Sequence, residues 1–351
     1  MQLKHLGWND RLAQHFAPYA QQGYGVGRVA IAHRDQYHLY TDQGHCTAVV
    51  SGKFRHQAHS IQDFPVVGDW VVMETQTHPA VIHGVLPRTS QFTRRAAGTR
   101  TQAQIIAANL DTIFLVSGLD HDFNLRRIER YLVMTWESGA NPVIVLNKAD
   151  LCEDIEDQLS AVANIAISVP ILALSALTRD KIADLDPYLQ PGQTVALLGS
   201  SGVGKSTLTN QLLGKAVQAT QAVRVDDSRG RHTTTHREML QLPSGALLID
   251  TPGMRELQLW TAEESLQETF SDLEALAQSC RFRNCQHQSE PGCAVQEAIA
   301  EGRVPMQRLQ SYRKLQREQA HVQRQQDPLA QRNRKKRWKA ITKSMRQNRQ
   351  G

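Results

Sequence analysis

A glycine-rich octapeptide in the second half of the chain could bind phosphate. Residues 199–206 read GSSGVGKS, in which a glycine is followed, after four residues, by Gly-Lys-Ser. Such glycines let the backbone turn tightly enough for successive N–H groups to converge on a β-phosphate, helped by the positive N-terminus of the next helix. We expect Lys205 to reach the β- and γ-phosphates and Ser206 to hold Mg²⁺. The residues predicted to bind the nucleotide here are Gly199, Ser200, Ser201, Gly202, Val203, Gly204, Lys205, Ser206 and Thr207.

A second motif could read a guanine base. Residues 147–150 read NKAD and follow the apolar run VIVL. The carboxylate of Asp150 could accept hydrogen bonds from two guanine donors, N1 and N2, which adenine does not offer, and Lys148 could pack along the base. A site built to pair both donors rejects the wrong base, because its own carboxylate would be left unmatched. The residues predicted to contact the base are Asn147, Lys148, Ala149, Asp150, Ser175 and Ala176.

A third motif, DTPG at 250–253, follows the apolar run ALLI downstream of the phosphate loop. Asp250 could bind Mg²⁺ through a water, and the backbone N–H of Gly253 could sense a γ-phosphate. DTPG by itself is also an ordinary turn. Its position after a phosphate loop and a buried strand favours a nucleotide-dependent switch element.

Four further residues have the side chains of a metal site. Cys280, Cys285, His287 and Cys293 offer three thiolates and an imidazole within one short polar segment. Four nitrogen and sulfur ligands suit a tetrahedral, structural Zn²⁺. The spacing departs from paired CxxC motifs, and a histidine near cysteines can be only a neighbour. The polar residues between them argue against an ordinary buried cluster, so the sequence predicts one structural zinc ion.

The elements that position these motifs are those of an α/β domain. Continuous apolar runs such as LDTIFLVSGL and TVALLG are typical of parallel strands buried on both faces, and LRRIERYLVMTWESG between two such runs has helical spacing. The base-reading motifs precede the phosphate loop, which reverses the usual order for a GTPase. Cutting and rejoining a sheet at surface loops preserves a site, so we predict a circularly permuted GTPase domain over 105–260.

The N-terminal region has a different pattern. Five short β-rich stretches separated by turn signals lie between residues 24 and 87 and predict a small β-barrel or β-sandwich over 1–87. The basic segment at 52–59 is predicted to be a loop, either one that contacts nucleic acid or a solvated connection. The polar, aperiodic run at 88–104 is predicted to be a linker.

Composition limits the function classes. The 351 residues allow two or three domains, and 40% hydrophobic with 21% charged residues excludes a wholly disordered or fibrous chain. No apolar run approaches the roughly 18 residues of a membrane helix, so we expect a cytoplasmic protein with no membrane partner. Nine basic residues and no acidic one fall within 331–351. This basic tail, which includes Trp338, indicates either a polyanion partner or a solvated end.

Taken together, the barrel, the motifs NKAD, GSSGVGKS and DTPG in that order, and the CxxxxCxHxxxxxC segment resemble the bacterial ribosome small subunit-dependent GTPase A family. The resemblance covers residues 24–315 and includes GRHTTT at 230–235 and SYRKL at 311–315. It implies an OB-fold barrel, a circularly permuted P-loop GTPase domain and a C-terminal helical zinc-binding domain over 261–330. It also implies GTP hydrolysis to GDP and phosphate, stimulated by the small ribosomal subunit and its rRNA, in late maturation of that subunit. We expect the chain to act as a monomer.

The catalytic assignment rests on the same resemblance. In Ras-like GTPases a glutamine after the DxxG glycine orients the attacking water, and here that position is Met254. The resemblance points instead to His232, whose alternative is a solvated loop histidine. One of the threonines at 233–235 is expected to complete the Mg²⁺ shell, and Thr234 is the one predicted.

Two other classes of function stay open at this stage. The chain could be a nucleotide-gated RNA-binding module or RNA chaperone without stimulated turnover. It could also be a signalling GTPase that acts on a protein, with the tail as a solubilising end.

Overall fold

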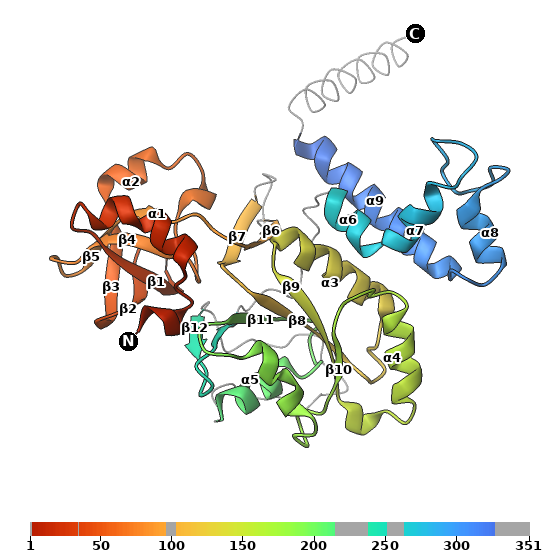
Figure 1. Ribbon diagram of the computed structural model, residues 1–351, viewed down its shortest axis with the longest axis horizontal. Coiled ribbons are helices and arrows are strands. Elements are labelled where there is room, and N and C mark those ends of the chain that lie inside the picture. Colours follow the sequence, from red (N-terminus) through yellow and green to blue (C-terminus); the bar gives the residue numbers. More distant parts are fainter. Residues whose placement is uncertain (1, 34, 96–102, 215–237, 251–262, 327–351) are drawn as a thin grey trace, which may run out of the picture. The chain divides into compact units, whose positions relative to one another are not determined.

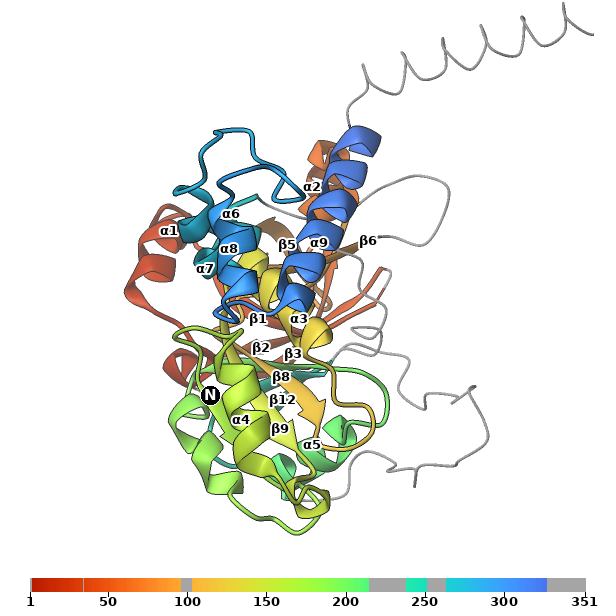
Figure 2. The same cartoon turned by 90° about the vertical axis from the view of Figure 1, so that its right-hand side faces the viewer.

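The computed structural model describes residues 2–33, 35–95, 103–214, 238–250 and 263–326 (Figures 1 and 2). The chain divides into two compact units, each described separately below. The first contains residues 1–94 and 104–258, and the second contains residues 95–103 and 259–351. Within the described ranges, no helix combines the length and the apolar character that crossing a membrane requires.

The first unit begins with a five-stranded barrel, which confirms the five strands predicted from the sequence. Its strands pair in the order β1-β2-β3-β5-β4, and β4 pairs with β1 to close the barrel. Alternate residues face inward, so that Val29, Leu39, Val71 and Ile82 form a core from four different strands. The elements are η1 (Leu3–Leu6), α1 (Asp10–Ala20), β1 (Gly25–Ala32), β2 (Tyr37–Thr41), β3 (Gly44–Val50), α2 (Gly52–Gln57), η2 (Ile61–Asp63), β4 (Trp70–Glu74) and β5 (Ala80–Val85).

The loop predicted at 52–59 is wrong over most of its length, because α2 occupies Gly52–Gln57. The side chain of Ser51 caps this helix by accepting a hydrogen bond from the Phe54 backbone N–H at 3.0 Å. Phe54 packs against the barrel core and against Phe64. One cap and one apolar anchor therefore fold a segment whose remaining side chains are mostly exposed.

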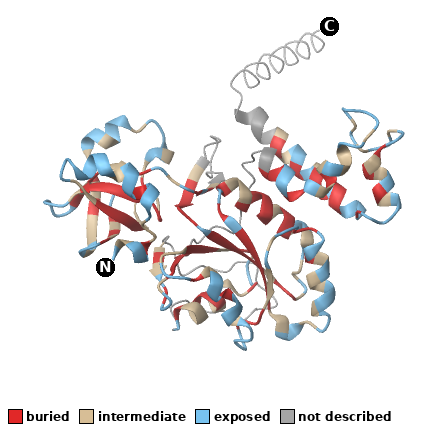
Figure 3. Cartoon of the chain, viewed as in Figure 1, coloured by how far each residue is buried: buried red, intermediate tan, exposed pale blue. Residues whose placement is uncertain are grey.

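The rest of the first unit is a mixed α/β sheet in the strand order β10-β9-β8-β11-β13-β12. The first five strands are parallel, and β12 runs antiparallel to β13. The four central strands, β9, β8, β11 and β13, are mostly buried (Figure 3), as their continuous apolar runs predict, whereas the outer strands β10 and β12 are largely half-buried. The elements are β8 (Thr112–Gly118), α3 (Leu125–Ser138), β9 (Asn141–Asn147), η3 (Ala149–Leu151), α4 (Ile155–Ala163), β10 (Ile171–Ala173), η4 (Ile182–Tyr188), β11 (Thr194–Leu198), α5 (Lys205–Leu213), β12 (Glu238–Gln241) and β13 (Leu247–Asp250).

The permuted order is visible in this sheet. The strand that leads into the phosphate loop, β11, lies between β8, which precedes it by about eighty residues, and β13, which follows it. The strand that leads into NKAD, β9, lies on the other side of β8. The carboxyl ends of these parallel strands therefore share one edge of the sheet, which is where ligands bind in open α/β sheets.

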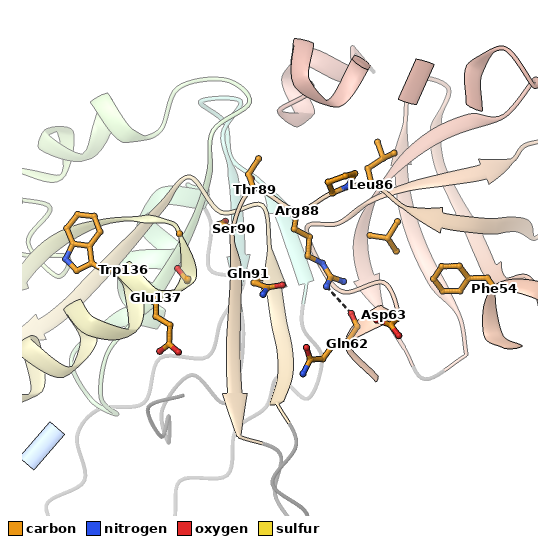
Figure 4. A pocket seen from close by; sticks show the side chains of 14 residues that line it. Phe54, Gln62, Asp63, Leu86, Arg88, Thr89, Ser90, Gln91, Trp136 and Glu137 are labelled. Carbon is orange, nitrogen blue, oxygen red and sulfur yellow. Dashed lines mark hydrogen bonds between the residues drawn. The ribbon is translucent and has the colours of Figure 1, made fainter. Parts of the chain in front are cut away.

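The connection predicted as a linker at 88–104 is instead ordered at both ends. β6 (Gln91–Arg95) and β7 (Ala103–Ala108) form a two-stranded sheet. Arg88 donates to both carboxylate oxygens of the buried Asp69, at 2.8 and 2.7 Å. The guanidinium of Arg88, one of the polar groups that suggested a linker, is thus held by fixed hydrogen bonds. A groove of about 670 Å³ opens beside this connection (Figure 4), and the described residues that line it include none from NKAD or the phosphate loop.

The barrel and the mixed α/β sheet are joined by backbone and side-chain contacts. β1 pairs with β12, with Ile31 opposite Glu238, so the two sheets are continuous. The Tyr40 hydroxyl of β2 donates to the Met239 carbonyl oxygen of β12 at 2.9 Å. These contacts explain why residues that the sequence divides into two domains form one compact unit.

The described residues 263–326 of the second unit form four helices and irregular segments, the longest of them at 278–293. It contains α6 (Glu263–Thr269), α7 (Ser271–Ala277), α8 (Ala294–Ala300) and α9 (Met306–Gln326). Phe270, Leu273 and Leu309 are among its buried apolar residues. Arg308 is also buried, and its guanidinium donates to both carboxylate oxygens of Asp272, at 2.7 and 2.6 Å. This bidentate pair fixes α9 against α7.

Candidate nucleotide-binding site and metal centre

The predicted phosphate loop connects β11 to α5, as the motif requires. Gly202 and Gly204 have φ of +83° and +94°, the left-handed region that favours glycine. At Gly199, a Cβ would lie 2.3 Å from the Val116 carbonyl oxygen, so any side chain would collide with the backbone of β8. Three of the predicted loop residues are therefore glycines for a reason visible in the backbone.

Lys205 lies against its own loop. Its ammonium group donates to the carbonyl oxygens of Gly199 at 2.7 Å and Ser200 at 2.5 Å. Lys205 is the first residue of α5, whose unpaired N–H groups and dipole attract anions. Its ammonium can therefore exchange these two carbonyl oxygens for phosphate oxygens. Ser206 and Thr207 follow in the first turn of the same helix and are half-buried.

Asn147 connects three of the predicted motifs. Its buried side-chain amide donates to the Val203 carbonyl oxygen in the phosphate loop at 2.8 Å. Its side-chain oxygen accepts from the Ala176 backbone N–H at 2.9 Å. A Cβ on Gly204 would lie 2.2 Å from this amide nitrogen, which explains the third glycine of the loop. The structure thus brings the base-reading and phosphate-binding segments together.

The remaining NKAD residues form the turn that follows β9. Lys148 has a φ of +65° and Ala149 and Asp150 begin η3, with Asp150 exposed. The Ala149 N–H donates to the Leu174 carbonyl oxygen at 3.1 Å, which holds this turn beside the end of β10. An exposed carboxylate at the carboxyl edge of the sheet can accept hydrogen bonds from a base.

Ser175 and Ala176 are buried just past β10. The Ser175 N–H donates to the Asp180 carbonyl oxygen at 3.1 Å, and its hydroxyl accepts from the Thr178 N–H at 3.2 Å. These bonds close a tight loop and leave the Ala176 N–H to Asn147. The two residues therefore belong to a fixed loop that is hydrogen-bonded to the first residue of the base-reading motif.

Three charged residues of this site were not predicted from the sequence. Asp120 pairs with Lys148 at 2.6 Å, and Asp122 pairs with Arg127 at 2.5 Å while accepting from the Ser200 hydroxyl at 2.6 Å. They follow β8, the strand between the two motif-bearing strands. Two carboxylates directly after a buried strand are the signal that could have identified them.

Four predicted residues are described only in part or not at all. His232, Thr234 and Gly253 lie outside the described residues. Asp250 ends β13, where its backbone pairs with Glu238 of β12. It is thus at the carboxyl end of the strand adjacent to β11.

The four predicted metal ligands converge in the second unit. The potential ligand atoms of Cys280, Cys285, His287 and Cys293 all lie within 4.8 Å of one another. The Cys280 sulfur is 3.6 Å from His287 Nδ1 and 3.9 Å from the Cys293 sulfur, and His287 Nδ1 is 3.4 Å from the latter. Tetrahedral zinc with ordinary bond lengths separates sulfur from sulfur by about 3.8 Å and sulfur from nitrogen by about 3.6 Å. The geometry fits such an ion.

The surroundings of the cluster also fit a cation. Burial and the hydrogen bonds with Cys293 and Cys280 raise the pKa of the Cys285 thiol to about 11. Burial, followed by the charge of Arg313, lowers the pKa of His287, which favours the neutral imidazole that binds metals. The carboxylate of Glu290 accepts from three backbone N–H groups between the ligands, including that of Gln288 at 2.7 Å.

Known protein families match the part of the chain that carries the site. The family model described as RsgA GTPase matches residues 85–260. A model described as ABC transporter matches residues 182–348, a range that contains the phosphate loop found in many nucleotide hydrolases.

Individual relatives are similar over most of the chain. The small ribosomal subunit biogenesis GTPase RsgA of Opitutus terrae is 48% identical, over 99% of this chain and 97% of that protein. RsgA 2 of Lactiplantibacillus plantarum is 50% identical, over 86% of this chain and 85% of its own length. The crystal structure of YjeQ from Thermotoga maritima superposes with a TM-score of 0.64 at 28% identity, covering 85% of this chain and 99% of that one. YloQ, a circularly permuted GTPase, gives 0.61 at 26% identity, covering 87% and 96%.

Proposed function

The chain belongs to the RsgA GTPase family, and from that premise we propose that it hydrolyses GTP to GDP and phosphate on the small ribosomal subunit, late in the maturation of that subunit. The relatives are named for biogenesis of the small ribosomal subunit. Stimulation by that subunit and the late timing are the parts of this proposal that the family resemblance suggests.

One observation carries the proposal. Asn147 hydrogen-bonds both Val203 in the phosphate loop and Ala176 in the second base loop. A single amide thus holds together the segments that would contact the phosphates and the base. Separated stretches of a permuted chain converge as a guanosine nucleotide site requires.

Each part of the nucleotide has a proposed contact. Asp150 accepts from guanine N1 and N2, and Lys148 packs along the base. Lys205 and the backbone N–H groups of residues 199–207 bind the phosphates. The exposed position of Asp150 and the contact of Lys205 with its own loop support these roles.

Magnesium binding and catalysis are assigned to residues of the phosphate loop, of DTPG and of the GRHTTT segment. Ser206, Asp250 and Thr234 would hold Mg²⁺, which neutralises charge that develops on the phosphates. His232 would orient the attacking water, because Met254 occupies the position after the DTPG glycine and has no polar group for that role. Gly253 would sense the γ-phosphate through its N–H. Intrinsic hydrolysis is then slow, and its acceleration requires a group delivered by the proposed switch segment at 222–235 or by a partner.

The metal of the second unit is proposed to be one structural zinc ion held by Cys280, Cys285, His287 and Cys293. The nearly tetrahedral spacing of the ligand atoms supports this choice. Zinc supplies folding energy to the loop between α7 and α8 and takes no part in hydrolysis.

We assign RNA contacts to the barrel, the metal-binding segment and the basic tail at 331–351. Three modest contacts on one chain add avidity without any single strong site. In the GTP state these surfaces bind rRNA together, and hydrolysis releases the subunit. A monomer in the cytoplasm, free of membranes, suits this role.

The test is phosphate release from GTP with and without purified small subunits, using large subunits as the matched control. We expect strong stimulation by small subunits only, and loss of that stimulation in His232→Ala with GDP affinity retained. Equal rates with and without small subunits would favour the alternative, an RNA-binding module or RNA chaperone without stimulated turnover. Salt-sensitive RNA binding that disappears when residues 331–351 are deleted would argue against a signalling GTPase directed at a protein.

A further inference from the structure

The loop that follows β8 touches both nucleotide motifs. The Asp120 carboxylate accepts from the Lys148 ammonium group at 2.6 Å, in the base-reading motif. The Asp122 carboxylate accepts from the Ser200 hydroxyl at 2.6 Å, in the phosphate loop. The Asp122 backbone N–H donates to the Asp120 carboxylate at 3.0 Å. One continuous chain of hydrogen bonds therefore runs from Lys148 to Ser200.

Arg127 completes this arrangement from the first turn of α3. Its Nη1 atom lies 2.5 Å from the Asp122 carboxylate and 2.7 Å from the Ser200 hydroxyl oxygen. The Ser200 hydroxyl thus donates to a carboxylate and accepts from a guanidinium, which fixes its orientation in both roles. The Asn124 side chain caps α3 by accepting from the Arg127 backbone N–H at 3.2 Å. Arg127 is therefore presented from a fixed backbone.

Charge reinforces the geometry. Burial would raise the pKa of the Asp122 carboxyl, but the hydrogen bonds from Arg127 and Ser200 outweigh burial and lower it. Both side chains of the Asp122–Arg127 pair are about one-third exposed, so solvent screens their attraction and the pair adds little to stability. The pair instead fixes the orientation of the Ser200 hydroxyl, because a hydroxyl that donates to one side chain and accepts from the other has only one favourable orientation.

We propose that Asp122 and Arg127 are positioning residues that hold the phosphate loop in its nucleotide-binding conformation through the Ser200 hydroxyl, while Asp120 holds Lys148 from the same loop. Neither role is catalytic. The inference rests on the proposed nucleotide site and adds how that site is kept in shape before the nucleotide arrives.

A positioning role and a catalytic role affect KM and kcat differently. A loop that is already in place binds the ground state and the transition state alike, so loss of the positioning contacts raises KM and leaves kcat nearly unchanged. A residue that acts on the γ-phosphate only in the transition state would lower kcat instead. The split between KM and kcat therefore separates positioning from catalysis.

The experiment uses the full-length protein with Mg²⁺ and a fluorescent GDP analogue. We expect Ser200→Ala, Asp122→Ala and Arg127→Gln each to weaken GDP binding about five- to twentyfold and to raise KM for GTP by a similar factor. Arg126→Gln is the matched control, because it removes an exposed arginine one position away on another face of α3. It should bind GDP as the wild type does. The melting temperature without nucleotide should be the same for all four variants.

A double-mutant cycle sharpens the test. Ser200→Ala combined with Asp122→Ala should cost no more affinity than the larger single loss, because both remove the same contact. Additive losses, affinities equal to the Arg126→Gln control, or a fall in kcat at unchanged KM would each overturn the proposal. If Asp122→Ala lowers the melting temperature, the smaller Ser200→Ala change decides. Failure of the wild type to bind GDP would instead refute the proposed function.

Discussion

The side-chain amide of Asn147 donates to the carbonyl oxygen of Val203 at 2.8 Å, across 56 residues of sequence. Val203 is the residue before Gly204 in the phosphate loop, and Asn147 begins the base-reading motif. The same amide's oxygen accepts from Ala176. This one buried residue thus fixes the distance between the parts of the site that would contact base and phosphate.

Replacing Asn147 with Ala should weaken GDP binding by about ten- to thirtyfold. The change leaves the Val203 carbonyl and the Ala176 N–H without their buried partner, at about 1–3 kcal/mol for an unsatisfied group. Isothermal titration calorimetry with GDP measures the loss. Asn164→Ala is the control, since Asn164 is exposed at the end of α4. Equal affinity of the two variants would show that Asn147 does not organise the site.

The motifs could be predicted from sequence because their chemistry is local. The left-handed backbone at Gly202 and Gly204 is available to glycine at little cost, so the residue types themselves report the conformation. The buried parallel strands can be predicted from the sequence because they are continuous apolar runs. The contact of Ser200 with Arg127 spans 73 residues and depends on which strands become neighbours, which no local pattern specifies.

The errors have equally specific causes. The basic residues of 52–59 suggested a loop, whereas the Ser51 cap and the apolar anchor Phe54 stabilise the helix α2 there. The polar letters of 88–104 suggested a linker, whereas Arg88 is bound to Asp69 inside the fold. In the first case a local cap and one apolar anchor decide the conformation, and in the second a polar side chain is bound by a tertiary partner. Composition alone indicates neither.

Arg28 should be among the most destabilising positions to truncate. It is almost fully buried in β1, and its guanidinium donates to the carbonyl oxygens of Leu6, Gly68 at 3.2 Å and Asn109 at 3.0 Å. Burial lowers its pKa to about 10, which still leaves it charged at neutral pH. Arg28→Ala leaves a cavity and takes the guanidinium away from the Leu6 and Asn109 carbonyls, whereas the Gly68 carbonyl still accepts from the Asn109 side-chain amide at 3.0 Å. The change should cost about 3–5 kcal/mol.

The measurement for Arg28 is urea-induced unfolding followed by tryptophan fluorescence. Arg11→Ala, an exposed arginine of α1, is the control and should change stability by less than about 0.5 kcal/mol. Arg28→Lys should recover only part of the loss, because one ammonium group does not match the planar fork of Arg28. Similar midpoints for Arg28→Ala and Arg11→Ala would contradict this reading of the buried guanidinium.

Removing one metal ligand should release the ion. Native mass spectrometry of the full chain should show one zinc per molecule, and Cys293→Ser should show none, because zinc needs all four ligands for a closed site. Cys46→Ser, outside the cluster, should retain the metal. Glu290→Ala should weaken zinc binding about 10- to 100-fold, since its carboxylate orders three backbone N–H groups of the ligand loop. Full zinc occupancy in Cys293→Ser would refute the assignment.

Acid should weaken the fold partly through Asp120. Burial would raise the pKa of this carboxyl, but hydrogen bonds from Lys148 and from the Asp122 N–H outweigh burial and lower it. A carboxyl whose pKa is lower in the folded state contributes stability above its unfolded pKa of about 3.9, and this is lost as the pH falls through the folded value. Asp120→Asn should therefore lose stability less steeply than the wild type between pH 5 and pH 3. Unfolding midpoints at each pH test this, with exposed Asp157→Asn expected to follow the wild type.

The hydrogen bond from the Tyr40 hydroxyl to the Met239 carbonyl connects the barrel directly to strand β12 of the GTPase domain. β12 begins three residues after the predicted switch segment at 222–235, and β1 of the barrel pairs with it. Binding of the barrel to the small subunit would then act on the strand that follows the switch segment.

Tyr40→Phe should leave basal hydrolysis unchanged and lower the small-subunit-stimulated rate about fivefold, the equivalent of one hydrogen bond of about 1 kcal/mol. Tyr24→Phe, another barrel tyrosine, is the control, with its ring against His83. If both variants are stimulated as strongly as the wild type, the barrel communicates with the switch by some other route.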